Sequence, residues 1–380
     1  MENNISYFKN KKNIIVVMRG ASAVNFREGI NLLVQNIHSS IGPVNITYTT
    51  RWLKKKDNIV VPGHIWIEVS GAAQSLEEAL VPFANASLSM LPTLSLSANA
   101  AISDPDLEIG FDNTKGVAER DYFQCYFPPE NDEIYSHRYI NIEATIALIN
   151  ALNTHPDRER LIRAANQYRL ALDYWRLGRD SLCVAHLWMS IEVLTMAKIR
   201  AECKVRNLKS PEELANDIGI EKKNLDPYIR KELLLKGDNE CYSKAKKASD
   251  GFEHGFLDYG EIIKSSKDIR HRMAEHIRIA LLEMCSLDEG NFNILSKEPF
   301  KKPLGCWPIV EYLRGKLIGG SDQLAKEGNA YPFIRWKPTI INTSVDKNGK
   351  YNIKIKDAFT KELGQGISFQ PVSREVWQAD

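Results

Sequence analysis

A stretch that is apolar around almost its whole circumference, Arg179 to Arg200, constrains the fold more than any other part of the chain. Its large apolar residues are Leu182, Val184, Leu187, Trp188, Met189, Ile191, Val193, Leu194 and Met196. A helix on the surface of a protein is apolar on one stripe only, so a helix of this kind needs neighbours on several sides. The sequence therefore predicts a central helix surrounded by other helices.

The size and charge of the chain limit the number of domains and the kinds of partner that it can bind. At 380 residues it is longer than a typical single domain, which predicts two or three domains. Hydrophobic residues at 43% and charged residues at 26% are ordinary for a globular protein. The formal net charge of +2 gives no general attraction to nucleic acid or to an anionic membrane, so such binding would need a local patch.

Helical patterning extends on both sides of the central stretch, from Asn141 to about Leu287. Residues 142–152 make a short helix, and Thr154 with Pro156 begins another that runs to Gly178. Later helices begin at the Ser210-Pro211-Glu212-Glu213 string and at Asp226-Pro227. The last helix carries a stripe at Ile262, Ile269, Met273, Ile277, Leu281 and Met284, which predicts one buried face.

The two ends of the chain have a different character. Near the N-terminus we expect helices at 26–38 and from Ser75, and strands at 14–18, 45–52, 59–69, 107–111 and 122–127. Near the C-terminus we expect strands at 336–345, 351–355 and 366–369, with a hairpin turn at 346–349. The prediction is an α+β multidomain protein with an N-terminal α+β domain (1–130), an all-helical domain (138–288) and a small β-rich domain (295–380).

Composition also bears on location and cofactors. The six cysteines are widely scattered and form no close pair of the kind that holds zinc or does redox chemistry, which suits a reducing compartment. The N-terminus does not read as a secretory signal. Pro82 and Pro92 interrupt the apolar stretch 76–102, which favours a packed helix pair over a membrane span. We predict a cytoplasmic protein with no membrane association, no cofactor and no metal.

The strongest functional hint is the heptapeptide SDGFEHG at residues 249–255. Gly251 and Gly255 accept backbone angles that other residues resist, so Asp250, Glu253 and His254 could be aimed at one point. Just before it, Lys244, Lys246 and Lys247 form a local basic cluster. We expect this stretch to be a loop in front of the last long helix.

Residues 141–287 resemble the higher eukaryotes and prokaryotes nucleotide-binding (HEPN) superfamily, in particular its Apea-like branch. The string LWMSIEVLT, residues 187–195, is similar to the family's central helix, in which an apolar run carries a single Glu, here Glu192. The FEHG string, residues 252–255, falls where the family has a His-Gly pair. The resemblance implies a four-to-five-helix bundle, a homodimer, and metal-independent RNase activity in a toxin or antiviral defence system.

The resemblance also assigns roles to residues. It implies catalytic roles for His254, Asp250, Glu253 and Glu192, and RNA binding by Lys244, Lys246 and Lys247. The family motif has an Arg four to six residues before the His, where this chain has Ser249. A guanidinium serves well to stabilise the charge on the reacting phosphate, and a lysine replaces it only as a point charge.

A second register uses residues inside the last helix. Arg270-His271 followed by His276 fits the motif as a string, but Arg270 and His276 lie roughly 120° apart around a helix that turns about 100° per residue. Arg272 and His276 are neighbours at positions i and i+4.

Three possibilities for the function therefore stay open. The first is an effector that cleaves or senses RNA. The second is a HEPN-like interaction or sensor module without catalysis, in which Asp250 caps a backbone group, His254 ends a helix, and Glu192 pairs with a nearby Arg or Lys because a lone buried carboxylate is costly. The third is a sensor whose N-terminal domain binds a phage protein or a nucleotide as its trigger.

Overall fold

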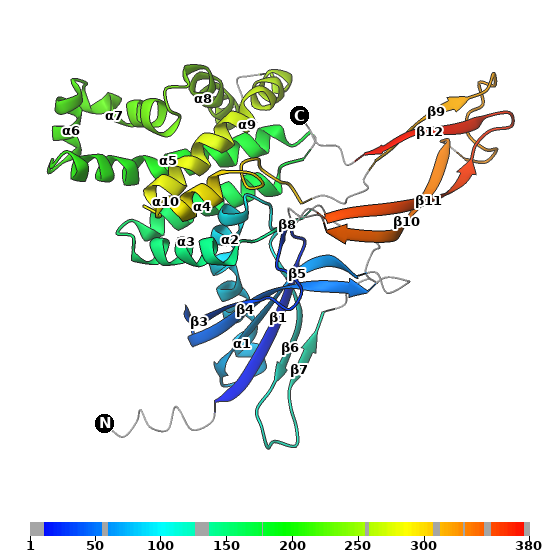
Figure 1. The fold of residues 1–380 in the computed structure, drawn as a ribbon, viewed down its shortest axis with the longest axis horizontal. Coiled ribbons are helices and arrows are strands. Elements are labelled where there is room, and N and C mark those ends of the chain that lie inside the picture. The colour runs from blue at the N-terminus through cyan, green and yellow to red at the C-terminus, as the bar shows by residue number, and fades with distance from the viewer. Residues whose placement is uncertain are drawn as a thin grey trace. The chain divides into compact units, whose positions relative to one another are not determined.

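The structure is a computed structural model, and it describes residues 11–54, 60–125, 137–176, 178–254, 258–306, 312–329, 331–345 and 351–375. The protein has a mixed α+β fold, with an N-terminal sheet, a central helical region and small C-terminal sheets (Figure 1). By contacts the chain divides into two compact units. Unit 1 comprises residues 1–50, 65–127 and 137–306, and unit 2 comprises residues 51–64, 128–136 and 307–380. The N-terminal sheet and the helices thus share one unit.

The large sheet of unit 1 has six strands in the order β3-β4-β5-β1-β6-β7. Its central strand β1 pairs antiparallel with both β5 and β6. The strands of unit 1 are β1 (Lys12–Gly20), β2 (Val24–Asn25), β3 (Leu32–Ser39), β4 (Gly42–Lys54), β5 (Val60–Ala73), β6 (Asp106–Asp112), β7 (Tyr122–Gln124) and β8 (Arg138–Tyr139), of which β4 and β5 extend into unit 2.

The helix predicted at 26–38 is wrong, because this segment contains the edge strand β3. The strand pairs with β4 and has a bulge between Val34 and Ile37, where Asn36 adopts a left-handed φ of 56°. Leu32 and Val34 face inward before the bulge, and Ile37 and Ser39 face inward after it. The extra residue turns a period of two into a spacing of three, which imitates a helical pattern.

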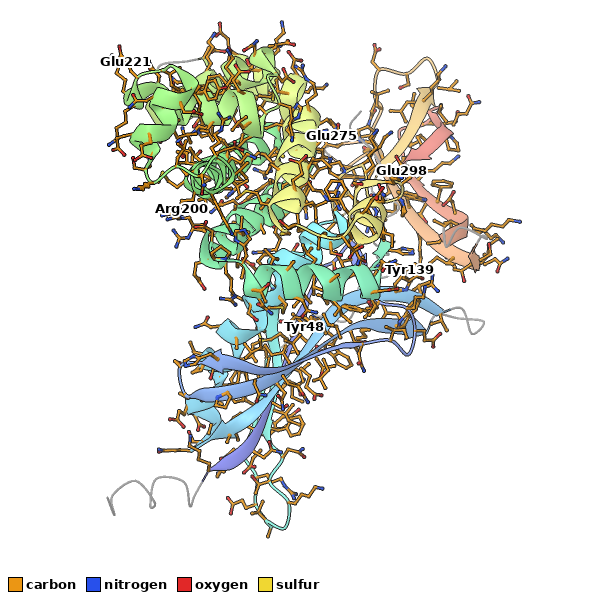
Figure 2. All side chains as sticks on the ribbon, turned by 60° about the vertical axis from the view of Figure 1, so that its left-hand side comes forward. Tyr48, Tyr139, Arg200, Glu221, Glu275 and Glu298 are labelled. Carbon is orange, nitrogen blue, oxygen red and sulfur yellow. The ribbon has the colours of Figure 1, made fainter. Side chains whose placement is uncertain are left out.

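The apolar stretch after the sheet forms α1 (Leu76–Ser87), a short 3-10 turn η4 (Leu88–Met90) and α2 (Leu91–Ala98). Ser75 caps α1 as predicted, its hydroxyl accepting a hydrogen bond from the amide of Glu78. α1 packs on the sheet, and the buried Tyr48 of β4 donates its hydroxyl to the carbonyl of Ser87 (Figure 2). By length and composition the segments Leu76–Ala98 and Asp180–Val205 could cross a membrane, but more than half of each apolar window is buried inside the protein, as in core helices.

The remaining helices of unit 1 follow β8. They are α3 (Ile142–Thr154), α4 (Arg158–Asp173), α5 (Asp180–Val205), α6 (Pro211–Ile218), the 3-10 turn η5 (Lys222–Asn224), α7 (Leu225–Tyr228), the π-helical segment η6 (Ile229–Leu234), α8 (Asn239–His254), α9 (Tyr259–Met284) and α10 (Glu289–Ser296). The predicted central helix is α5, which contacts α4, α6, α8, α9 and η6. All six residues of the predicted stripe on α9 are buried within this chain. The stripe therefore needs no second copy to cover it, and the homodimer rests on the resemblance alone.

The C-terminal end of α2 is buried, and arginine side chains satisfy its carbonyl groups. Arg278 of α9 donates to the carbonyls of Leu96 and Ser97, and Arg138 donates to those of Ala98 and Asn99. The last carbonyls of a helix have no partner inside it and carry partial negative charge, so a cation is well placed there. Burial lowers the pKa of each guanidinium to about 10, which leaves both charged at neutral pH.

Unit 2 consists of two two-stranded ribbons and the distal ends of β4 and β5. One ribbon pairs β9 (Tyr312–Ile318) with β12 (Ser368–Glu375), and the other pairs β10 (Phe333–Val345) with β11 (Tyr351–Glu362). Strands predicted near 336–345, 351–355 and 366–369 are confirmed, and the turn predicted at 346–349 lies outside the described residues.

We expect Arg278→Met to lower the free energy of unfolding by about 3 kcal/mol, because two buried carbonyls lose their donors while the apolar volume is nearly kept. Urea unfolding followed by circular dichroism measures the loss. Arg278→Lys, which keeps a cation at the helix end, should lose clearly less. A loss below about 0.5 kcal/mol for Arg278→Met would contradict the capping role.

Candidate functional site

The stretch predicted as a catalytic loop is helical up to His254, and this part of the prediction is wrong. Residues 249–254 form the last turns of α8. Ser, Asp and Gly favour turns, but Cys241, Ala245 and Ala248 give α8 a buried stripe whose packing overrides that preference. The side chains of Glu253 and His254, and residues 255–257, lie outside the described part of the structure.

The three lysines predicted to bind RNA are paired with carboxylates. Lys244 contacts Glu240 at 2.8 Å and Asp268 at 3.0 Å. Lys246 contacts Asp250 at 2.8 Å, and Lys247 contacts Glu261 at 3.4 Å. Hydrogen bonds to Glu240 and Asp250 raise the pKa values of Lys244 and Lys246, respectively. Asp250 is thus the partner of a lysine one turn earlier, and the cluster carries little free positive charge.

Arg270, from the second register, is a buried structural residue. Its guanidinium is 1% exposed, lies 2.7 Å from the carboxylate of Asp180, and stands over the ring of Trp175 at 4.9 Å. His271 packs edge-on against the same ring at 4.9 Å. These contacts hold the start of α5 against α9, away from solvent and from any RNA.

Arg272 and His276 do lie together, as expected for positions i and i+4. The Arg272 guanidinium lies 3.2 Å from the carboxylate of Asp238, and Nε2 of His276 lies 3.4 Å from the same carboxylate. Arg272 also contacts Glu240 at 3.0 Å. With Lys244 and Asp268 this surface has two permanent cations and three carboxylates, a formal net charge of −1. Such a surface repels a phosphate group.

Glu192 is half exposed and pairs with an arginine, as the non-catalytic interpretation expects. Its carboxylate accepts hydrogen bonds from Arg230 of η6 and from the indole of Trp188, both at 3.2 Å. The Arg230 guanidinium also lies over the Trp188 ring and donates to Thr195. This network joins η6 to α5, and Trp188 also contacts Tyr242 of α8, with 5.9 Å between the ring centroids.

A cleft elsewhere in the helical region was not predicted. It has a volume of about 890 Å³ and is lined by the α3–α4 connection and by the C-terminal turns of α3, α5 and α9. Arg200 on its rim contacts Asp157 at 2.5 Å and is visible at the edge of the helices in Figure 2. Lys198, also in the lining, contacts Glu202 at 3.0 Å. Lys204 is exposed there and has no carboxylate partner among the described residues.

His155 lies in this cleft with a fixed hydrogen-bonding role. Its Nδ1 accepts a hydrogen bond from the amide of Asp157 at 2.9 Å, so the neutral ring carries its proton on Nε2. Burial lowers the pKa of His155; Asp157 opposes this shift and Lys204 reinforces it. His155 is therefore a neutral donor at pH 7 and a poor general base. The sequence carries a signal for it in the string Thr154-His155-Pro156-Asp157, in which Thr154 and Pro156 also indicate a helix start.

Comparison with protein-family models, with curated proteins and with solved structures gives no match. The HEPN resemblance therefore stays a prediction. Within the described residues, no three side chains of His, Cys, Asp or Glu gather as a metal site would require.

We expect Arg270→Ala to lower the free energy of unfolding by about 3 kcal/mol, because it leaves the carboxylate of Asp180 buried without its partner. Asp180→Ala should cost a similar amount, and the double variant less than the sum of the two. Arg272→Ala is the matched control, exposed and on the same helix, and should cost no more than about 1 kcal/mol. Equal effects of Arg270→Ala and Arg272→Ala in chemical denaturation would contradict the buried pair.

Proposed function

We propose that this protein is a HEPN-like sensor or interaction module that does not cleave RNA, and that its helical region binds a ligand with an anionic group in the α3–α5–α9 cleft. The observation that carries the proposal is a contrast between two surfaces. On α8 and α9 the lysines and arginines implied by the nuclease motif are paired or buried, whereas in the cleft Lys204 is exposed and has no carboxylate partner in the described part of the chain.

The cleft contains the chemical groups that bind such a ligand: a cation, a hydrogen-bond donor and apolar walls. Lys204 supplies a charge, and His155 presents Nε2–H as a second donor. Ala201, Val205 and Met284 supply apolar walls. A volume of about 890 Å³ lies within the usual range for small-molecule sites. A nucleoside monophosphate combines a phosphate anion with a flat aromatic base that can pack on these apolar walls, and it is a suitable probe.

A purely structural role for Lys204 is the competing interpretation. Lys204 lies in the last turn of α5, where a cation stabilises the helix dipole. That role predicts a small loss of stability in a variant and no response to any ligand. The two interpretations therefore differ in whether a ligand changes the melting temperature of the protein.

We expect millimolar adenosine monophosphate to raise the melting temperature of the wild-type protein and to leave that of Lys204→Glu unchanged. Binding at a hundredfold excess over Kd stabilises a protein by about 2.7 kcal/mol, which a thermal shift detects. Lys264→Glu, an equal charge change about 30 Å away along α9, is the control and should respond like wild type. No shift for wild type, or an equal shift in Lys204→Glu, would contradict the cleft site.

We also expect no cleavage of total cellular RNA by the wild-type protein in the absence of added metal. The reason is that metal-independent cleavage needs an available acid and base beside a positive charge, and the cations that the motif implies on α8 and α9 are paired with carboxylates or buried. Cleavage by wild type that is lost in His254→Ala would refute the non-catalytic proposal and restore the nuclease assignment.

A further inference from the structure

The β10–β11 ribbon of unit 2 has two chemically different faces. Directly paired residues in an antiparallel ribbon point to the same face, and the faces alternate along each strand. On one face Ile340 and Ile353 pack against Leu53 and Val61 from the distal ends of β4 and β5. On the other face the side chains are exposed almost without exception.

The charged side chains on the exposed face are almost all basic. Its cations are Arg335 and Lys337 on β10, and Lys354 and Lys356 on β11. The one carboxylate on this face within the described residues is Glu362, which accepts a 2.5 Å hydrogen bond from Arg335. Lys337, Lys354 and Lys356 have no carboxylate partner among the described residues. The paired lysines of α8 show that charge pairing is common elsewhere in the chain.

The register spaces these cations regularly. Arg335 pairs with Thr360, Lys337 with Ala358, Lys356 with Thr339 and Lys354 with Asn342, so each of four successive rungs contributes one cation. Rungs on one face are about 6.8 Å apart, because a strand rises about 3.4 Å per residue. Lys337, Lys356 and Lys354 therefore lie on consecutive rungs over about 14 Å, and Arg335, whose charge Glu362 balances, lies on the next rung.

Two exposed aromatic rings extend the line at its Arg335 end. Tyr331 is 67% exposed and Phe333 is 54% exposed, and their rings meet edge to face at 6.3 Å. Exposed aromatic rings of this size are uncommon on a surface that serves only solubility. Unpaired bases stack on such rings without regard to their sequence.

From this line of cations and its adjoining rings we infer that the exposed face of the β10–β11 ribbon binds single-stranded nucleic acid. Lys337, Lys354 and Lys356 contact successive phosphates, and Tyr331 and Phe333 stack on bases. Lysines on a ribbon also discourage pairing with other chains, but that role does not call for exposed aromatic rings beside them. The inference does not rest on the helical cleft, and it needs no catalysis.

The test is fluorescence anisotropy of the full chain with a labelled single-stranded RNA of about 15 nucleotides and mixed sequence, repeated over a series of salt concentrations. The triple variant Lys337→Glu, Lys354→Glu, Lys356→Glu should lose about a hundredfold or more in affinity, and the slope of log K against log salt should fall by about 2 in magnitude. The double variant Tyr331→Ala, Phe333→Ala should lose about tenfold or more with little change in that slope.

Lys361→Glu is the matched control for the single variant Lys356→Glu, which makes an equal charge change, because Lys361 lies on the same strand but pairs with Ile334 on the opposite face. It should bind within about threefold of wild type. Labelled single-stranded DNA and duplex RNA of the same sequence are run in parallel, with circular dichroism of every variant. Three results would overturn the inference: no binding by wild type at low salt, an equal loss in Lys361→Glu and Lys356→Glu, or duplex binding as tight as single-strand binding.

Discussion

The buried C-terminal end of α2 is the point on which the arrangement of unit 1 depends. Four carbonyls there accept hydrogen bonds from Arg138 and Arg278. Asn99, in a left-handed conformation just after the helix, donates to the carbonyls of Phe300 and Lys301 and accepts from the hydroxyl of Tyr168. Beside the sheet, the backbone amide of Ala23 donates a hydrogen bond to the carbonyl of Ala101. A buried polar group without a partner is costly, so this set of bonds specifies one arrangement of sheet and helices.

The surfaces of this protein differ in whether their lysines and arginines are paired with carboxylates, and this difference determines which surfaces can bind an anionic ligand. Where a lysine or arginine meets a carboxylate, as along α8 and α9, the pair joins helices and offers little to a phosphate. Where a cation stands alone in the described structure, as at Lys204 or Lys337, it remains available to a ligand. The net charge of +2 conceals this difference, because both kinds of surface contribute to one total.

The sequence predicted the elements that depend on local patterns and missed those that depend on distant partners. The sequence alone predicted the apolar circumference of α5, the helix caps at Ser75 and Ser210, and the strands of the β10–β11 hairpin. The bulge in β3 was not, because it shows only in the register with β4.

The candidate sites depend still more on distant partners. The spacing around Arg270 matched a catalytic motif, but its role is set by Asp180, which is ninety residues away in the sequence. The basic face of the ribbon required the register of β10 and β11. The predicted SDGFEHG loop is helical up to His254 because the apolar spacing of α8 outweighs the preference of Ser, Asp and Gly for turns.

Hydrogen exchange resolved by segment is the most direct measurement of the claim that the end of α2 joins sheet and helices into one cooperative unit. The account predicts that protected amides in β1, β5, α2, α4 and α9 share one opening free energy, and that denaturant lowers it equally for all of them. A helical region that opens at least about 2 kcal/mol more easily than β1 and β5 would contradict it, because the two parts would then unfold independently.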